Sequence, residues 1–173
     1  MSVVLMGYRG SGKSSVGRAL ADRLGLRFVD LDDAVCARFG GATVAEIWAD
    51  PGEQAFRAVE CEVVASWLTE PGVVLALGGG TPMQAAAADA IRQSSALKVY
   101  LQASAEELDS RTRADPASVD HRPALTAAGG GLDEVRAVLA EREPTYRALA
   151  DREIDTSGQS VETLVDRIAA MAD

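Results

Sequence analysis

The chain has 173 residues, a length that suits one domain, and its 17 lysines and arginines against 26 aspartates and glutamates give a formal charge of −9. Hydrophobic residues make up 47% and charged residues 25% of the chain, which argues against a disordered chain or a fibrous repeat. No apolar run approaches the roughly 20 residues of a membrane-spanning helix, and the acidic balance argues against a nucleic-acid groove.

The remaining composition predicts a protein that stays inside the cell. The apolar segment 1–6 is too short, and lacks the basic lead-in, for a secretory signal. Cys36 and Cys61 form neither a metal-binding spacing nor a disulfide scaffold, so we expect both to be reduced. We therefore expect a cytoplasmic monomer without membrane or nucleic-acid partners. Lys13 and Lys98 are the only lysines, and the many arginines suit a small anionic ligand because a guanidinium binds carboxylates and phosphates in pairs of hydrogen bonds.

Short apolar segments that end in glycine or polar residues predict strands. The first runs directly into Gly7, and the third follows the break at Pro71-Gly72. The predicted strands are Val3–Met6, Leu26–Leu31, Val73–Leu77, Leu97–Leu101 and, more weakly, Arg152–Asp155.

Apolar residues spaced by three and four between these segments predict helices. One pattern stops at Gly25, which is typical of a glycine C-cap, and Thr43…Glu46 and Ser104…Glu107 have the spacing of capping boxes. The helical patterns are Val16-Leu20-Leu24, Phe56-Val59-Val63-Trp67, Leu132-Val135-Val138-Leu139 and Val161-Leu164-Val165-Ile168. Strands that alternate with helices predict a single α/β domain over residues 1–173, with a parallel sheet covered on both faces.

The clearest chemical signal is the segment from Gly7 to Ser14, which satisfies the pattern G-x-x-x-x-G-K-[ST] between a predicted strand and a predicted helix. Small residues let backbone N–H groups surround phosphate oxygens, and the helix N-terminus adds partial positive charge. Lys13 reaches the outer phosphates, and the Ser14 hydroxyl suits Mg²⁺. The segment predicts binding of a nucleoside triphosphate.

Acidic residues follow the second predicted strand. Asp30 and Asp32 are two apart, so on an extended segment they point the same way, one toward Mg²⁺ and the other toward an acceptor hydroxyl. Asp33 is expected to be the N-cap of the helix that follows. A solvated helix cap is the alternative for the other two acids.

Two further groups have both a structural and a functional interpretation. Arg57 and Glu60 are three residues apart on one helix, either as an exposed ion pair or with Glu60 holding Arg57 against an anionic substrate. Gly78, Gly79 and Gly80 end the third strand, either as a flexible turn or as backbone that a ligand approaches closely.

The segment from Arg111 to Gly131 has little apolar periodicity, and we interpret it as a mobile lid. Arg122 on this segment would stabilise the charge of a transferring phosphate, with a solvated loop arginine as the alternative. His121, the only histidine, has no neighbour that supports it as a base.

Taken in order, these motifs resemble the shikimate kinase family of P-loop proteins over nearly the whole chain. The segment from Gly52 to Arg57 followed by the triple glycine is more specific than the phosphate loop. The motifs are Gly7–Ser14, Asp30–Asp32, Gly52–Glu60, Leu77–Gly80, Arg122-Pro123, Arg142–Tyr146 and Asp155-Thr156.

The resemblance implies transfer of the γ-phosphoryl group of ATP to the 3-hydroxyl of shikimate, in the chorismate route to aromatic amino acids. It implies a three-layer P-loop fold with a five-stranded parallel sheet flanked by helices. It also implies a substrate-binding helical segment at residues 33–60 and a lid at residues 112–125.

The resemblance also implies the site residues, with ATP as co-substrate and Mg²⁺ as cofactor. Ser14 would ligate Mg²⁺ directly and Asp30 through water, while Asp32 would accept a hydrogen bond from the reacting hydroxyl, as base or as orienter. The residues implied to be catalytic are Lys13, Asp32 and Arg122. Nucleotide binding is implied for Gly10, Ser11, Gly12, Lys13, Ser14, Ser15, Arg111, Arg122 and Gln159. Shikimate binding is implied for Asp32, Arg57, Gly78, Gly79, Gly80 and Arg142, with the two arginines on its carboxylate.

Two rival functions remain at this point. Another small-molecule kinase of the same fold, for gluconate or a nucleoside monophosphate, would share the phosphate loop but lack the set of Asp32, Arg57 and the triple glycine. A guanine-nucleotide switch would need an Asn/Thr-Lys-x-Asp element, and neither lysine lies in one.

Overall fold

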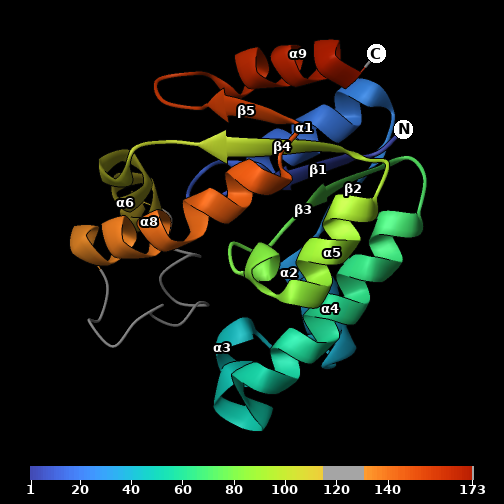
Figure 1. The fold of residues 1–173 in the computed structure, drawn as a ribbon, viewed down its shortest axis with the longest axis vertical. Helices are drawn as coiled ribbons and strands as arrows, with labels where there is room; N and C mark the ends of the chain where they lie inside the picture. The colour runs from blue at the N-terminus through green and yellow to red at the C-terminus, as the bar shows by residue number, and fades with distance from the viewer. Residues whose placement is uncertain (115–130, 173) are drawn as a thin grey trace.

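The computed structural model describes residues 1–114 and 131–172, and a parallel five-stranded sheet lies at its centre (Figure 1). The strand order is β2-β3-β1-β4-β5, and every neighbouring pair is parallel. The strands are β1 (Val3–Met6), β2 (Arg27–Asp30), β3 (Val73–Ala76), β4 (Leu97–Gln102) and β5 (Arg152–Asp155). The predicted five-stranded parallel sheet is confirmed, and each strand lies within one residue of its predicted position.

The sheet order places the motifs of the sequence at one edge. β1 is the central strand, with Val3 level with Val74 of β3 and with Leu97 of β4. β3 separates β1 from β2, and Asp30 at the end of β2 is level with Ala76 of β3. Because parallel strands end at the same edge, the phosphate loop after β1, the acids after β2 and the glycines after β3 are adjacent there.

Helices cover both faces of the sheet, as expected from β1 and β3, which are apolar and buried throughout. Val3 and Leu5 face α1 and α9, whereas Val4 and Met6 face the opposite layer, because successive side chains of a strand alternate. The first layer is α1 (Lys13–Leu24) and α9 (Val161–Ala172). The second layer is α2 (Leu31–Arg38), α4 (Glu53–Thr69), α5 (Ala85–Gln93) and α8 (Leu132–Leu149). No helix in the described ranges is long and apolar enough to cross a membrane.

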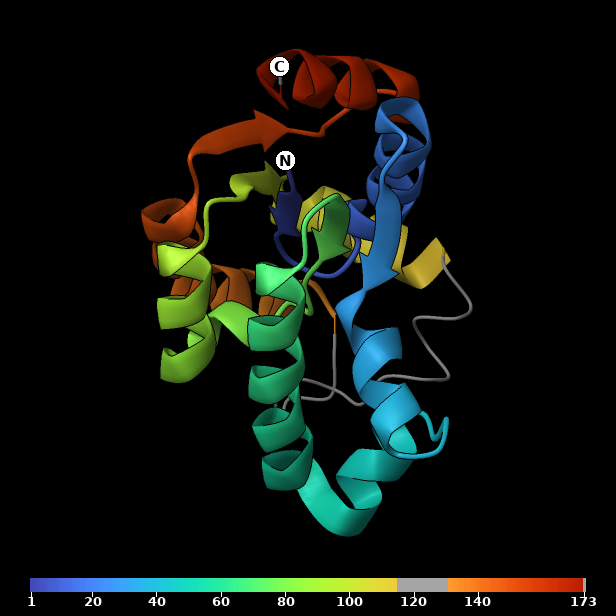
Figure 2. The same cartoon turned by 90° about the vertical axis from the view of Figure 1, so that its right-hand side faces the viewer.

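Shorter elements extend the fold beyond the edge of the sheet. α3 (Val44–Ile47) and the distorted turn η1 (Trp48–Gly52) lead into α4, and Figures 1 and 2 show this arm at the end of the molecule opposite α9. The capping box predicted at Thr43 is present, since Glu46 N donates to Thr43 Oγ1 and Thr43 N donates to Glu46. The remaining elements are the short turn η2 (Thr81–Met83) and α6 (Ala105–Ala114).

The structure corrects the prediction for the helix after β2. α2 begins at Leu31, directly after the strand, and Asp30 is its N-cap because its side chain accepts a hydrogen bond from Asp32 N at 3.1 Å. Asp33 lies inside the first turn, so the prediction that it is the N-cap is wrong. No loop separates strand from helix, so the first acid becomes the cap. Asp32 is therefore helical, and the expectation that it shares an extended segment with Asp30 is wrong as well.

A second correction concerns the segment predicted as irregular. Arg111 and the next three residues belong to the last turn of α6, so the segment does not begin as a loop. Ser104 Oγ accepts a hydrogen bond from Glu107 N and caps this helix as predicted. Most of the predicted lid, including His121 and Arg122, lies outside the described residues.

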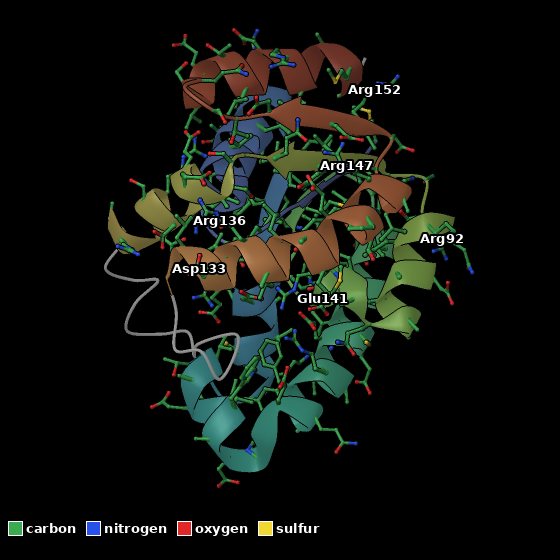
Figure 3. All side chains as sticks on the ribbon, turned by 60° about the vertical axis from the view of Figure 1, so that its left-hand side comes forward. Arg92, Asp133, Arg136, Glu141, Arg147 and Arg152 are labelled. Atoms are coloured by element: carbon green, nitrogen blue, oxygen red, sulfur yellow. The ribbon has the colours of Figure 1, made fainter. Side chains whose placement is uncertain are left out.

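Many of the remaining charges are at the surface. Figure 3 labels six such residues, among them Arg92 on α5 and Arg136 on α8, and all six are exposed. Arg92 pairs with Asp89, and Arg136 pairs with Glu106. Exposed pairs of this kind contribute at most about 1 kcal/mol each, so the fold depends on its apolar layers instead.

The contact between α1 and β2 can be tested through Gly17. A Cβ at this buried position would lie 2.6 Å from the Phe28 ring. Glycine to alanine in a helix normally stabilises by about 1 kcal/mol, whereas overpacking costs about 1–3 kcal/mol. We expect Gly17→Ala to lower the free energy of unfolding in urea, and Asp22→Ala on the exposed face of α1 to leave it nearly unchanged. A more stable Gly17→Ala protein would contradict the close packing.

Candidate active site

The loop after β1 is held in one conformation by its glycines and its lysine. Gly10 and Gly12 have φ of 80° and 92°, in the left-handed region that favours glycine. A Cβ on Gly7 would lie 2.4 Å from the Leu101 carbonyl oxygen, so no side chain fits there. Lys13 Nζ donates to the carbonyl oxygens of Gly7 and Tyr8, both at 2.9 Å. The N-terminus of α1 and the ammonium group therefore share one concave loop, which suits an anion.

The hydroxyl of Ser14 meets a carboxylate next to this loop. Ser14 Oγ donates to Asp30 Oδ2 at 2.7 Å, joining the first turn of α1 to the end of β2. A hydroxyl and a carboxylate are hard oxygen donors of the kind that Mg²⁺ accepts, and Mg²⁺ uses few protein ligands because it keeps several waters. The donor set fits Mg²⁺, although no cluster of three or more acidic, histidine or cysteine side chains suits a metal within the described ranges.

A large cavity of about 780 Å³ opens above the loop. Its lining joins the loop to the end of β2, the glycines after β3, α6 and the segment after β5. The sequence-predicted residues that line it are Gly10, Ser11, Gly12, Lys13, Ser14, Ser15, Asp30, Asp32, Gly78, Gly79, Arg111 and Gln159.

A small cavity of about 50 Å³ adjoins the large one. Arg57 and Arg142 line it from α4 and α8, together with Trp48 of the arm and Phe56 of α4. Asp32 lines both cavities, so its carboxylate lies where they meet. The sequence-predicted residues that line the small cavity are Asp32, Arg57, Gly78, Gly79, Gly80 and Arg142.

Two of the three glycines after β3, Gly78 and Gly80, lie directly against the protein's own polar side chains. A Cβ on Gly78 would lie 2.5 Å from Asp32 Oδ1 and 3.1 Å from Glu60 Oε1. A Cβ on Gly80 would lie 2.8 Å from Arg57 Nη2. Gly78 and Gly80 therefore have a packing role, because carboxylates and a guanidinium lie against this backbone, and the approach of a ligand to it stays a prediction.

Glu60 connects these groups from within the protein. Its side chain is fully buried, and it accepts hydrogen bonds from Arg57 Nη1 at 2.9 Å and from Thr81 Oγ1 at 2.6 Å. Arg57 also bonds to Glu53 and lies 5.4 Å from the centre of the Trp48 ring. The arginine is only 17% exposed, so the exposed-pair interpretation of Arg57 and Glu60 is wrong.

The burial of this pair shifts the pKa of both partners. Burial raises the pKa of Glu60 above its ordinary value, although Arg57 and Thr81 act in the opposite direction. Burial lowers the pKa of Arg57, but the charges of Glu60 and Glu53 outweigh it, so the pKa lies above its ordinary value. Arg57 therefore stays charged and fixed in orientation at the wall of the small cavity.

Tyr146 of α8 holds the backbone of Gly79, which lines both cavities. Its buried hydroxyl donates to the Gly79 carbonyl oxygen at 2.5 Å, and burial raises its pKa to about 12. A Cβ on Gly79 would lie 3.6 Å from Arg142 Nη1, so the second arginine also lies close to this glycine. Arg142 and Tyr146 are four residues apart on one helix, which explains why they reach the same loop.

At the other end of the large cavity, Arg111 connects three segments. Its guanidinium donates to the Gly10 carbonyl oxygen at 3.3 Å and to Thr156 Oγ1 at 3.0 Å, and it pairs with Glu107 on its own helix. Gln159 lies nearby with its amide bonded to the Asp155 carbonyl oxygen. The hydrogen bonds from the N–H groups of Arg111 fix the orientation of its guanidinium.

The structure thus brings together all the sequence-predicted site residues except Arg122, which lies outside the described residues. Sequence reasoning missed Arg9, which lines both cavities, because its position in the loop motif accepts any residue. It also missed Trp48 and Thr81. An apolar ring and a threonine carry no signal until Arg57 and Glu60 are placed beside them.

Comparisons with known proteins show the family to which the chain belongs. The family model for shikimate kinase matches residues 9–173. A shikimate kinase of Mycobacterium avium is 42% identical over 171 residues, covering 96% of this chain and 93% of that protein. A shikimate kinase of Rhodopirellula baltica is 39% identical over 168 residues, covering 97% of this chain and 88% of that protein. The solved structure of an Acinetobacter baumannii shikimate kinase in complex with shikimate has a TM-score of 0.88 at 32% identity, covering 99% of this chain and 92% of that chain.

The raised pKa of Glu60 predicts a pH-dependent stability. The folded state holds this proton more tightly than the unfolded chain does. The contribution to stability is therefore complete below the ordinary value of 4.5 and is lost as the pH rises through the raised pKa. We expect the stability of the protein relative to its Glu60→Gln variant to fall over this window, by at most about 1.4 kcal/mol per pH unit. Urea unfolding of both proteins from pH 4.5 to 7 measures this difference in the free energy of unfolding. A difference that does not change with pH would contradict the raised pKa of Glu60. Glu62→Gln, on the exposed side of α4, is the control.

Proposed function

The chain belongs to the shikimate kinase family, and we propose that it transfers the γ-phosphoryl group of ATP to the 3-hydroxyl of shikimate. The products are shikimate 3-phosphate and ADP, and the reaction is a step toward chorismate and the aromatic amino acids. The single observation that carries this proposal in the structure is the meeting of the two cavities at Asp32, Gly78 and Gly79.

The large cavity suits ATP. Its loop offers backbone N–H groups and Lys13 to the phosphates, and the helix N-terminus favours negative charge there. Arg111 and the segment from Asp155 to Gln159 are proposed to flank adenine, and Arg111, Thr156 and Gln159 line this cavity. The edge of Arg111 is fixed by hydrogen bonds, which leaves a planar face suited to stacking on a base.

Ser14 and Asp30 are proposed to hold Mg²⁺, the first directly and the second through water. Their oxygens are already in contact beside the phosphate loop, which supports this assignment. When bound, the cation would offset charge on the phosphate oxygens.

The small cavity suits the carboxylate of shikimate, and the rest of the molecule would extend into the adjoining large cavity. Arg57 and Arg142 both line the small cavity, and each guanidinium can donate two parallel hydrogen bonds to the carboxylate. The backbone of Gly79 is offered to the substrate, held by the hydroxyl of Tyr146. Asp32 then faces the boundary, where it accepts the hydrogen bond and the proton of the reacting hydroxyl.

Some parts of the proposal extend beyond the two cavities. Arg122 is proposed to neutralise phosphate charge from a lid at residues 112–125, within one domain whose substrate-binding segment is residues 33–60. We also propose a cytoplasmic monomer. In the described ranges, the large apolar side chains that are exposed are Met1, Val161 and Met171, which form no evident interface.

The substrate class is tested by one assay. We expect ADP release, measured with a coupled assay, to accelerate with shikimate and to stay at the background rate with gluconate or a nucleoside monophosphate. Gluconate also carries a carboxylate that Arg57 and Arg142 could bind, so it is the stricter of the two comparisons. Faster release with gluconate or a nucleotide than with shikimate would contradict the proposal.

Asp32→Asn tests the role of the acid between the cavities. We expect turnover to fall by at least about 100-fold, because the amide cannot take the hydroxyl's proton. ATP binding measured by calorimetry should survive, since the phosphates contact the loop. Asp22→Asn on α1 is the matched control, with the same loss of charge at an exposed position. A near-normal rate for Asp32→Asn would show that Asp32 is neither base nor orienter.

Arg57→Ala tests recognition of the carboxylate. We expect calorimetry to show a loss of shikimate affinity of about 1–3 kcal/mol, because the carboxylate of the bound shikimate loses a hydrogen-bonding partner. The affinity for ATP should be retained. Arg57→Lys keeps the charge without the planar fork, so its shikimate affinity should lie between those of the unaltered protein and Arg57→Ala. Arg92→Ala on α5 removes an exposed arginine and serves as the control. Unchanged shikimate binding in Arg57→Ala would remove this residue from the substrate site.

A further inference from the structure

Arg9 lies at the tip of a tight turn in the phosphate loop. Ser11 N donates to the Tyr8 carbonyl oxygen at 3.2 Å and closes the turn, with Arg9 and Gly10 as its central residues. Gly10 has the φ of 80° that the third residue of a type II turn requires. Arg9 is therefore displayed at the outside of a backbone that carries the phosphate-binding residues.

The neighbours of Arg9 hold this turn rigidly. The Tyr8 side chain is buried in the apolar cluster between α6 and α8, against Leu108 and Val135. A Cβ on Gly10 would lie 2.9 Å from Thr112 Oγ1 and 3.0 Å from the Leu108 carbonyl oxygen, so the turn packs directly against α6. The residues before and after Arg9 are both held by packing, and this fixes the position from which the Arg9 side chain extends.

The position of Arg9 relative to the two cavities distinguishes it from the other cations. Within residues 1–114 and 131–172, it is the one cationic side chain that lines both cavities. Lys13 and Arg111 line only the large cavity, whereas Arg57 and Arg142 line only the small one. The other residues common to both are Asp32, Val44, Gly78 and Gly79. Arg9 therefore lies at the boundary, with the acid proposed to face the reacting hydroxyl.

We propose that Arg9 contacts the phosphoryl group as it passes from the nucleotide to the acceptor, which makes it a further catalytic residue. This inference rests on the proposed function. In the transfer, the acceptor oxygen bonds to phosphorus as the bond from phosphorus to the ADP oxygen breaks, and the hydroxyl proton goes to Asp32. Negative charge on the transferred group is spread over its equatorial oxygens, and a guanidinium donates to two of them at once.

A contact with the substrate carboxylate is the alternative for Arg9, and its position argues against that. Arg57 and Arg142 line the small cavity and not the large one, so two guanidinium groups are already available there for the carboxylate. A carboxylate held between them lies at the end of the substrate remote from the phosphoryl group. The two alternatives also differ kinetically, because a carboxylate contact acts on KM for shikimate and a phosphoryl contact acts on kcat.

The test compares Arg9→Met and Arg9→Lys with the unaltered protein, using Arg92→Met as the matched control. We expect Arg9→Met to lower kcat by roughly 10²–10³-fold, the loss typical of one donor to a developing charge, with KM for shikimate little changed. Arg9→Lys should recover part of the rate. ADP with tetrafluoroaluminate, which imitates the transferring phosphoryl group, should bind more weakly to Arg9→Met by a similar factor, while ADP alone binds normally.

Three results would overturn the inference. The first is an unchanged kcat in Arg9→Met, and the second is a raised KM for shikimate with a normal kcat. The third is a loss of affinity for ADP alone that equals the loss for ADP with tetrafluoroaluminate, which would mean that Arg9 only shapes the loop. Failure of the unaltered protein to phosphorylate shikimate would instead overturn the proposed function. In that case the binding of ADP with tetrafluoroaluminate still decides the role of Arg9.

Discussion

The carboxylate of Glu60 is buried without any exposed surface, and two hydrogen bonds hold it there. Removing one partner of a buried ion pair costs about 3–5 kcal/mol, so this group persists only while Arg57 and Thr81 both stay in place. Through them it joins α4 to the turn after β3, and Gly78 lets Asp32 approach the same point. Glu60 therefore fixes the direction of Arg57 beside the small cavity, which Asp32 also lines.

The sheet order explains why the two cavities meet at all. β3 lies between β1 and β2, so its glycines separate the phosphate loop from the acids. The glycines that follow β3 leave room at the end of this strand, and the groups on either side approach each other across them. Arg9 from one side and Asp32 from the other reach the boundary that this gap creates. A strand with ordinary side chains at that point would keep nucleotide and acceptor apart.

Much of this arrangement could be predicted from local patterns, and the exceptions have physical causes. The phosphate loop, the strands and the helix stopped by Gly25 are set by neighbours in the sequence, and all are present. The cap at Asp30 was missed because a strand can pass into a helix with no loop between them, which periodicity does not reveal. The burial of Glu60 was missed because Thr81 is distant in the sequence, and an i,i+3 pair looks the same whether it is exposed or buried. The positions of the site residues were predictable by resemblance, whereas that of Arg9 needed coordinates.

The scarcity of lysine has a practical consequence once both lysines are placed. Lys98 is 12% exposed, paired with Asp151 and bonded to the carbonyl oxygens of Ser94 and Ala96. Lys13 lines the large cavity. Apart from the terminal amine, an acylating reagent attached to a nucleotide would meet a single accessible primary amine, that of Lys13. This amine lines the cavity in which the nucleotide itself would bind. Covalent labelling of this protein would therefore report occupancy of the pocket with almost no background from the surface.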